Sequence, residues 1–315
     1  MNSKIEFILG VFILSSIFIG CNLIGGKENE EGNTTGTPPP PHHEFPRWSP
    51  DGTTILYYSY GLIEYDPANN SALYDTDSTG IWAMNSDGTN HRKIISADYA
   101  DWSPSGDSIV FSAEGNIYTG RYASGIIDTA SIEQLTFEGR NFFPTWSPNG
   151  KWIAYRRSLS GESTHIQGIW RMDTKGDNIE QLFSGNSGSP AWNVSGTKLG
   201  FFRGVINSSG NVLGDKFWFY TFDNDRLTEL VFLKGDNRYP KYSSDGQQIV
   251  FESDAHIWRI NVLGENLTQL TFEELGRMPD WSPNGKYIVF IGPKGTIWRM
   301  DKDGGNQVQL TFRPE

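Results

Sequence analysis

One short phrase recurs along this chain and narrows the folds that the chain can adopt. Its first copy is Pro46-Arg-Trp-Ser-Pro-Asp-Gly52, and its last is Pro279-Asp-Trp-Ser-Pro-Asn-Gly285. The copies lie roughly 40–50 residues apart, a period that is typical of solenoids, propellers and repeat arrays. Each copy carries one anchoring aromatic residue, and these are Trp48, Trp102, Trp146, Trp192, Tyr242 and Trp281.

The last repeat, which has no insertions, shows what one unit contains. A first strand at Trp281 runs into a Pro-Asn-Gly turn, where proline and glycine supply the backbone angles of a tight hairpin. Three segments rich in β-branched and aromatic residues follow at 286–290, 296–300 and 308–312. Such a unit is a four-stranded antiparallel blade, which predicts an all-β, six-bladed β-propeller over residues 44–315. The expected blades cover about 44–96, 98–138, 142–184, 188–233, 238–273 and 277–313.

The 11 tryptophans follow the repeat rather than the loops. All but Trp152 fall near the first strand or in the third strand of a unit. A large flat side chain at a fixed repeat position is typical of packing between blades, so we interpret these residues as core. Each unit begins on its innermost strand and ends on its outermost. We therefore expect blades six and one to meet by packing, without an exchanged strand.

The N-terminus has a composition of its own. Residues 7–19 form an apolar run that is too short for a comfortable membrane span and right for a signal-peptide core. The run closes on Phe18-Ile-Gly-Cys21, which resembles the lipobox of bacterial lipoproteins, and Cys21 is the single cysteine of the chain. We predict a lipoprotein signal at 1–21 with lipidation of Cys21. An uncleaved anchor and an ordinary signal peptide are the alternatives.

Residues 22–43 hold Gly, Asn, Glu and four consecutive prolines, and almost nothing that could be buried. This composition predicts a disordered tether. Its acidic segment 27–31 is either solvated linker or an export tag. Signal and tether together predict a lipid-anchored monomer in the bacterial cell envelope, on the periplasmic face of the outer membrane or on the cell surface.

Composition and motifs argue against several kinds of chemistry. The net charge of −11 disfavours a nucleic-acid partner, since such proteins carry a basic patch. The histidines, at 42, 43, 91, 165 and 256, lack the spacing of metal ligands, and we interpret His42 and His43 as the end of the tether. The chain has no Gly-x-Ser-x-Gly motif and no phosphate-binding glycine loop. We therefore expect no catalytic residue, no metal site and no cofactor.

One repeat position changes charge from blade to blade. Four residues before each anchoring aromatic, the chain has Glu44, Asp98, Phe142, Gly188, Arg238 and Arg277. In a propeller these positions should lie at the mouth of the central channel, with Tyr99, Arg140, Asn141 and Tyr239 beside them. Carboxylates of blades one and two would then oppose arginines of blades five and six and orient a peptide or an acidic ligand. The alternative is an ion pair between Glu44 and Arg277 across the seam.

Loop lengths point to the same face as the mouth. The connections between second and third strands are long at 60–79, 158–167 and 203–215, and long loops gathered on one face indicate the functional face. The third-to-fourth connection at 120–131 is an exception on the opposite face.

The repeat as a whole resembles a known family. Its elements are Pro-x-Trp-Ser-Pro-Asp/Asn-Gly, then Ile-Val-Phe, Ile-Trp-Arg-Met-Asp and Gln-Leu-Thr-Phe, and they are similar to the TolB-type, WD-like repeat. That repeat builds the propellers of TolB and of prolyl-oligopeptidase-type enzymes. The resemblance covers all six units, of which the fourth and fifth match least well. TolB also has an N-terminal α/β domain, whose place the predicted anchor and tether take here.

The resemblance implies a non-enzymatic module that binds an envelope protein or peptide at the channel mouth. Fold alone does not fix function, however. Some TolB-like propellers are lyases that use channel histidines. A glycan-active lyase or hydrolase is therefore one alternative, and a lipoprotein that recognises an extracellular glycan or peptide is another.

Overall fold

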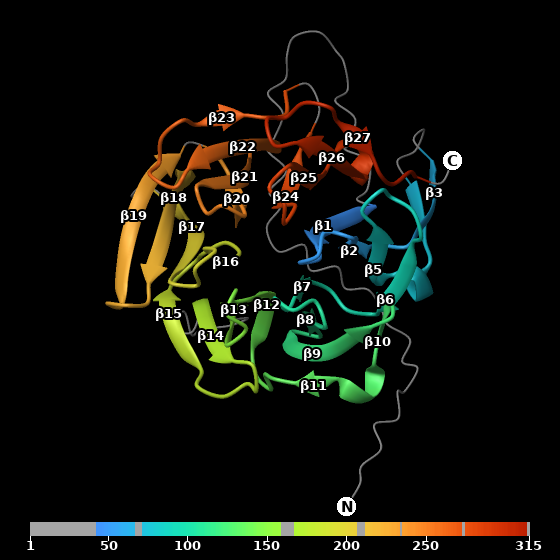
Figure 1. Cartoon of the computed structure of the whole chain (residues 1–315), viewed down its shortest axis with the longest axis horizontal. Helices are drawn as coiled ribbons and strands as arrows, with labels where there is room; N and C mark the ends of the chain where they lie inside the picture. Colours follow the sequence, from blue (N-terminus) through green and yellow to red (C-terminus); the bar gives the residue numbers. More distant parts are fainter. Residues whose placement is uncertain are drawn as a thin grey trace, which may run out of the picture. The chain divides into compact units, whose positions relative to one another are not determined.

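The computed structural model describes residues 42–66, 71–158, 167–206, 212–233, 235–272 and 275–313. Over these residues the chain forms six twisted antiparallel sheets that follow one another around a common axis (Figure 1). The predicted all-β, six-bladed propeller is confirmed. The signal, Cys21, the tether up to residue 41 and most of the predicted loop 158–167, with His165, lie outside the described residues, and what the sequence indicates for them stays a prediction.

In each of blades one to three, the strands follow one another from the channel outward. Blade one contains β1 (His43–Trp48), β2 (Thr54–Ser59), β5 (Gly80–Asn85) and β6 (Arg92–Ile95), with a separate hairpin of β3 (Leu62–Asp66) and β4 (Ser71–Tyr74). Blade two contains β7 (Ala100–Trp102), β8 (Ser108–Ala113) and β9 (Asn116–Ala123), and β10 (Ile126–Ile127) and β11 (Glu133–Gln134) share its outer edge. Blade three contains β12 (Arg140–Trp146), β13 (Trp152–Ser158), β14 (Gly168–Asp173) and β15 (Glu180–Ser184).

Blades four to six continue the same order. Blade four contains β16 (Ala191–Trp192), β17 (Lys198–Ile206), β18 (Val212–Thr221) and β19 (Arg226–Leu233). Blade five contains β20 (Asn237–Tyr242), β21 (Gln248–Ser253), β22 (His256–Asn261) and β23 (Thr268–Gln269), and blade six contains β24 (Arg277–Trp281), β25 (Tyr287–Ile291), β26 (Ile297–Asp301) and β27 (Val308–Gln309). Short 3-10 turns lie at η1 (Thr76–Ser78), η2 (Thr129–Ser131) and η4 (Pro293–Gly295). Within the described ranges, no helix has the length and apolar character needed to cross a bilayer.

The recurring Ser-Pro-Asp-Gly phrase is a hydrogen-bonded turn between the first and second strands of a blade. In blade one, Ser49 Oγ accepts from the backbone N–H of Thr54 (2.9 Å) and donates to Asp51 Oδ1 (2.6 Å). Gly52 follows with a φ of 74°, a backbone angle that favours glycine because a side chain would crowd it. The phrase therefore recurs because it closes the same hairpin in successive blades.

The two sets of tryptophans are buried to different degrees. Trp48, Trp102, Trp192 and Trp281, all in first strands, are 6–8% exposed, whereas those of the third strands are half-buried beside the clusters between blades. The indole N–H of Trp102 donates to the carbonyl of Arg47 in blade one, at 3.4 Å. That of Trp192 donates to the carbonyl of Thr145 in blade three, at 3.2 Å. Trp102 and Trp192 thus each link their blade to the one before it.

Blade six meets blade one without an exchanged strand, as predicted, because each sheet is made of its own consecutive strands. Phe45 and Trp48 of blade one share a hydrophobic cluster with Val289 and Leu310 of blade six. The backbone N–H of Trp48 also donates to Asp280 Oδ2 across this seam, at 2.9 Å.

Three interpretations from the sequence were wrong. His42 and His43 are not tether residues, because β1 begins at His43 and the two side chains are only 7% and 6% exposed. The segment 203–215 is not a free loop, because β17 and β18 stay paired as far as Ile206 and Val212. Strand β9 likewise extends to Ala123 and pairs there with β10, inside the expected loop 120–131. Because the strands stay paired, their backbone N–H and C=O groups bond to each other, whereas in a loop they would bond to water.

Candidate functional site

Four aromatic side chains fill the centre of the ring. Phe45, Tyr99, Phe143 and Tyr239 come from the innermost strands and their approaches, and we call them the plug. Tyr99 lies 4.6 Å from Phe45 and 4.1 Å from Phe143 between ring centroids, and Tyr239 lies 5.5 Å from Phe45. The void beside them has a volume of about 20 Å³, roughly the space of one water molecule.

A shared backbone irregularity turns three of the four plug residues inward, and Tyr99 lacks it. Phe45, Phe143, Tyr239 and Met278 each lie three residues before the anchoring aromatic and have φ between 51° and 54°. The pairing of the first and second strands shifts register at this point in all four blades. A bulge of this kind turns a side chain away from its regular face, and positive φ is costly for residues other than glycine. Packing in the centre offsets that cost.

A ring of charged residues lies one position before the anchoring aromatics. Arg47, Asp101, Lys241 and Asp280 alternate in sign around the channel. Asp101 Oδ2 accepts from Thr145 Oγ1 of the next blade at 2.8 Å, and burial raises the pKa of Asp280 and lowers that of Lys241. These contacts join neighbouring blades, so we assign this ring a structural role.

The mouth lies where the first strands begin and the second strands end. On blade one, burial raises the pKa of Glu44, whose Oε2 accepts a hydrogen bond from the Tyr60 hydroxyl at 2.9 Å. On blade six, Arg277 Nε lies 3.4 Å from Oε1 of the buried Glu252, and the backbone N–H of Met278 donates to Oε2 at 3.1 Å. Arg277 therefore pairs with a carboxylate of blade five, and its charge also reaches Glu44, where it acts to lower the pKa of that carboxyl.

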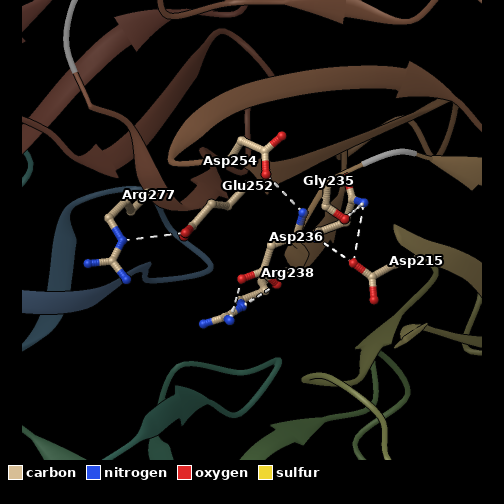
Figure 2. A network of polar contacts seen from close by, with 8 residues as sticks. Asp215, Gly235, Asp236, Arg238, Glu252, Asp254 and Arg277 are labelled. Atoms are coloured by element: carbon tan, nitrogen blue, oxygen red, sulfur yellow. Dashed lines mark hydrogen bonds and ion pairs between the residues drawn. The ribbon is translucent and has the colours of Figure 1, made fainter. Parts of the chain in front are cut away.

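Figure 2 shows how the arginines of blades five and six are compensated. Arg238 is paired with the Asp236 carboxylate, its Nε at 2.7 Å from Oδ1, and this pair raises the pKa of the guanidinium. Asp254 accepts from the backbone N–H of Asp236 at 3.0 Å, and Asp215 accepts from that of Asn237 at 2.6 Å. The predicted basic side of the mouth is thus neutralised by its own neighbours.

Asn141, predicted at the mouth, is instead a structural residue with 0% exposure. Its amide Nδ2 donates to the carbonyls of Gly115 (3.1 Å) and Glu138 (3.0 Å) and to Thr136 Oγ1 (3.2 Å). These acceptors belong to blade two and to the connection into blade three, so the side chain ties the two blades together. Asn237 occupies the same repeat position in blade five and is also buried.

The other predicted residues lie around the plug. The Arg140 guanidinium lies 5.9 Å from the Phe142 ring centroid, and Phe142 lies 6.1 Å from Tyr99. Gly188 contributes its backbone, which donates to the carbonyl of Phe202 at 2.8 Å.

Two mouth charges have no internal counter-charge in the part of the chain that the structure describes. Asp98 is half-buried, and burial, followed by the nearby Glu114 charge, raises the pKa of Asp98 to about 6. Arg156, on β13 opposite Phe142, is also half-buried; its Nε has no hydrogen-bond partner, and burial lowers the pKa of the guanidinium. Both charges act on the Tyr99 hydroxyl, with opposite effects on its pKa.

Arg156 was not among the residues predicted at the mouth from the sequence. The signal available was a charged residue at the mouth end of an otherwise apolar second strand, in the run Ile153-Ala-Tyr-Arg156. Over the described residues, no group of three His, Cys, Asp or Glu side chains is arranged to hold a metal ion.

Comparison with known proteins identifies the architecture. No family model matches the chain. An uncharacterized protein of Agrobacterium fabrum is 26% identical over 249 residues, which are 66% of this chain and 83% of that protein. The crystal structure of TolB from Acinetobacter baumannii matches with a TM-score of 0.63 at 20% identity, over 82% of this chain and 63% of TolB. The fold is that of a TolB-like six-bladed β-propeller.

Two further solved structures, both of enzymes by their names, are similar to this chain in fold at low sequence identity. The tricorn protease matches with a TM-score of 0.61 at 15% identity, over 86% of this chain and 26% of the protease. Hydrazine synthase of Kuenenia stuttgartiensis matches with a TM-score of 0.55 at 14% identity, over 88% of this chain and 81% of its own. Function therefore has to be argued from the site.

Proposed function

We propose that this TolB-like propeller is a non-enzymatic interaction module of the bacterial cell envelope, which binds a partner peptide or domain at its channel mouth. The observation that carries the proposal is the pair of uncompensated charges, Asp98 and Arg156, both near Tyr99. A half-buried charge without a partner lowers stability. A partner that brings one basic and one acidic group would compensate both.

Because the plug fills the channel, it favours binding of a partner at the surface of the ring rather than inside it. The void of about 20 Å³ beside the plug is too small for a substrate to enter the channel. Ligand sites in proteins usually enclose about 300–1,000 Å³, so chemistry inside this channel is disfavoured. The aromatic plug instead forms a floor against which a partner segment can pack.

The proposal includes anchoring through a lipid on Cys21, with residues 22–41 as the tether. Replacing the thiol, as in Cys21→Ser, removes the attachment point for the lipid. We expect the variant to move from the membrane fraction to the soluble fraction and to lose incorporation of radiolabelled palmitate. Retention of Cys21→Ser in washed membranes would contradict the anchor and leave the mouth proposal untouched.

The partner is tested by crosslinking in intact cells, followed by affinity purification and mass spectrometry. The double variant Asp98→Asn/Arg156→Gln should reduce recovery of the partner about tenfold, because two charged contacts are lost. Its matched control is Asp128→Asn/Arg121→Gln, which removes an exposed ion pair of 2.6 Å far from the mouth, beside the opposite end of β9. Equal recovery with the two folded double variants would refute binding at the mouth.

A further inference from the structure

A second hollow lies at the seam between blades six and one, away from the plug. Its volume is about 310 Å³, which is within the range of small-molecule sites in proteins. Blade one supplies His42, His43 and Trp82 among its lining residues, and blade six supplies Thr311 and Phe312. We call this hollow the seam pocket.

The two histidines are the unusual feature of the seam pocket. His42 and His43 are 7% and 6% exposed, their ring centroids are 3.7 Å apart, and the Nδ1 atom of each has no hydrogen-bond partner. Both rings line the hollow, but these Nδ1 atoms are themselves shielded from solvent, so a ligand in the hollow would contact other atoms of the two rings. Burial lowers the pKa of His42 to about 4 and that of His43 well below its usual value, so both rings are neutral near pH 7.

The third histidine of the pocket is already satisfied. His91 Nε2 contacts the Gly88 carbonyl at 2.8 Å, and since a carbonyl only accepts, this nitrogen carries the proton. His91 Nδ1 then accepts from the Tyr57 hydroxyl at 2.9 Å. The ring of Tyr57 meets that of His43 edge-on at 4.8 Å, so this hydrogen-bonded pair holds a wall of the pocket in place.

Two hydroxyl groups add donors to the same walls. Ser59 Oγ accepts from the backbone N–H of Gly61 at 3.2 Å, and Thr311 Oγ1 accepts from that of Ile297 at 2.8 Å. Each hydroxyl keeps a hydrogen that can be donated. The seam pocket therefore offers both donors and acceptors, and its acid, Asp75, already accepts from Ser78 and from the N–H of Asp77.

Aromatic surface completes the pocket. The indole N–H of Trp82 donates to the Ser78 carbonyl at 2.8 Å, which fixes the orientation of the ring. Phe312, at the edge of the pocket, is 71% exposed. Flat rings beside hydrogen-bonding groups suit a molecule that has C–H faces and hydroxyl edges.

We propose that the seam pocket binds a neutral, hydroxyl-rich molecule of monosaccharide size, either a free sugar or the terminal sugar of a glycan. A hydroxyl donates and accepts at once, which matches neutral imidazoles placed next to Ser59 and Thr311. A three-ligand metal site is not formed by the described residues. This site is separate from the mouth and does not depend on the proposed function.

Binding has a structural consequence that can be measured. The walls of the seam pocket come from both ends of the ring, which are joined by packing and not by a shared strand. A ligand that contacts both walls binds only the closed ring, so it raises the midpoint of thermal unfolding as its concentration increases.

The test is isothermal titration calorimetry of the full chain with glucose, galactose, mannose and N-acetylglucosamine, and with their methyl glycosides, which stand for the terminal sugar of a glycan. At least one sugar should bind and raise the unfolding midpoint. His43→Phe and Trp82→Leu should each weaken its affinity about tenfold, through loss of one hydrogen bond or of the aromatic wall. Trp298→Leu is the matched control, because Trp298 holds the same repeat position in blade six outside the pocket, and its affinity should stay within twofold of the wild type.

Three results would overturn the proposal. One is that no sugar binds at concentrations up to about 50 mM, which is beyond any useful affinity. Another is that glucuronate, adenosine or Zn²⁺ binds while the neutral sugars do not. The last is that a sugar binds equally well to His43→Phe. Should that variant not fold, ¹⁵N-histidine NMR of the wild type decides, because an occupied pocket must shift the ring signals of His42 and His43.

Discussion

The charged residues on two sides of the mouth are compensated in opposite ways. On blades five and six, Arg238 and Arg277 each have a carboxylate partner within the ring (Figure 2). On blades two and three, Asp98 and Arg156 have none among the described residues. The difference comes from the neighbouring strand and connection, which supply Glu252 and Asp236 on one side only. Charge at a repeat position therefore indicates a binding group only where the neighbouring elements leave it uncompensated.

Removing a carboxylate that compensates a mouth arginine should have the largest effect on stability. Glu252→Leu removes the carboxylate that pairs with Arg277 and that accepts from the buried N–H of Met278. We expect the free energy of unfolding to fall by about 2–3 kcal/mol. Urea denaturation measures the change. Glu252→Gln should lose less, because its amide oxygen can still accept, and Asp236→Asn should lose under about 1 kcal/mol, because its pair is exposed. Equal losses in the three variants would contradict this account.

Removing the negative charge of Asp98, which has no counter-charge among the described residues, should stabilise the protein. The folded-state pKa of Asp98, about 6, is above the usual aspartate value of 3.8, so ionisation lowers stability as pH rises from about 4 to 6, and the loss is complete above that range. Asp98→Asn removes this loss and should raise stability at pH 7.5 by about 1–2 kcal/mol, after allowance for partial exposure.

Thermal unfolding of Asp98→Asn and of the wild type at pH 4, 5, 6 and 7.5 measures the effect. The stability difference should shrink toward zero below pH 4, where both side chains are neutral. A constant difference across this range would mean that the asparagine acts through packing rather than charge.

The smallest effects on stability are expected for Arg156 and Arg238, of which only Arg238 has a carboxylate partner among the described residues. Arg156→Gln removes a half-buried charge without a partner, so stability should stay level or rise by up to about 0.5 kcal/mol. Arg238→Gln breaks a partly exposed ion pair, so stability should fall by about 0.5 kcal/mol. Chemical denaturation of the two variants side by side tests the signs, and the same sign in both would remove the proposed distinction.

Residues whose role depends on local pattern could be predicted from the sequence. The Ser-Pro-Asp-Gly turn is set by residues a few positions apart, so it marked six hairpins and hence six blades. Strand order within a unit likewise predicted a seam closed by packing. First-strand tryptophans were correctly interpreted as core because their burial follows from the repeat itself.

Residues whose role depends on a distant neighbour could not be predicted. His42 and His43 follow a proline run and look like linker, yet blade six covers them. Asn141 looks like an exposed loop residue, yet its amide joins blade two to blade three. Arg156 looks like any strand arginine, and only the closed ring places it beside Tyr99 and Tyr239.

The sequence by itself determined the number of blades, the strands within each blade and the turns between them, because these depend on hydrogen bonds and packing within about 50 residues. Only the tertiary structure decided which charges are compensated, that the channel is plugged, and that a polar pocket lies at the seam. Each of those features brings together residues from blades far apart in the chain, where the strength of an electrostatic contact depends on burial and distance rather than on residue type.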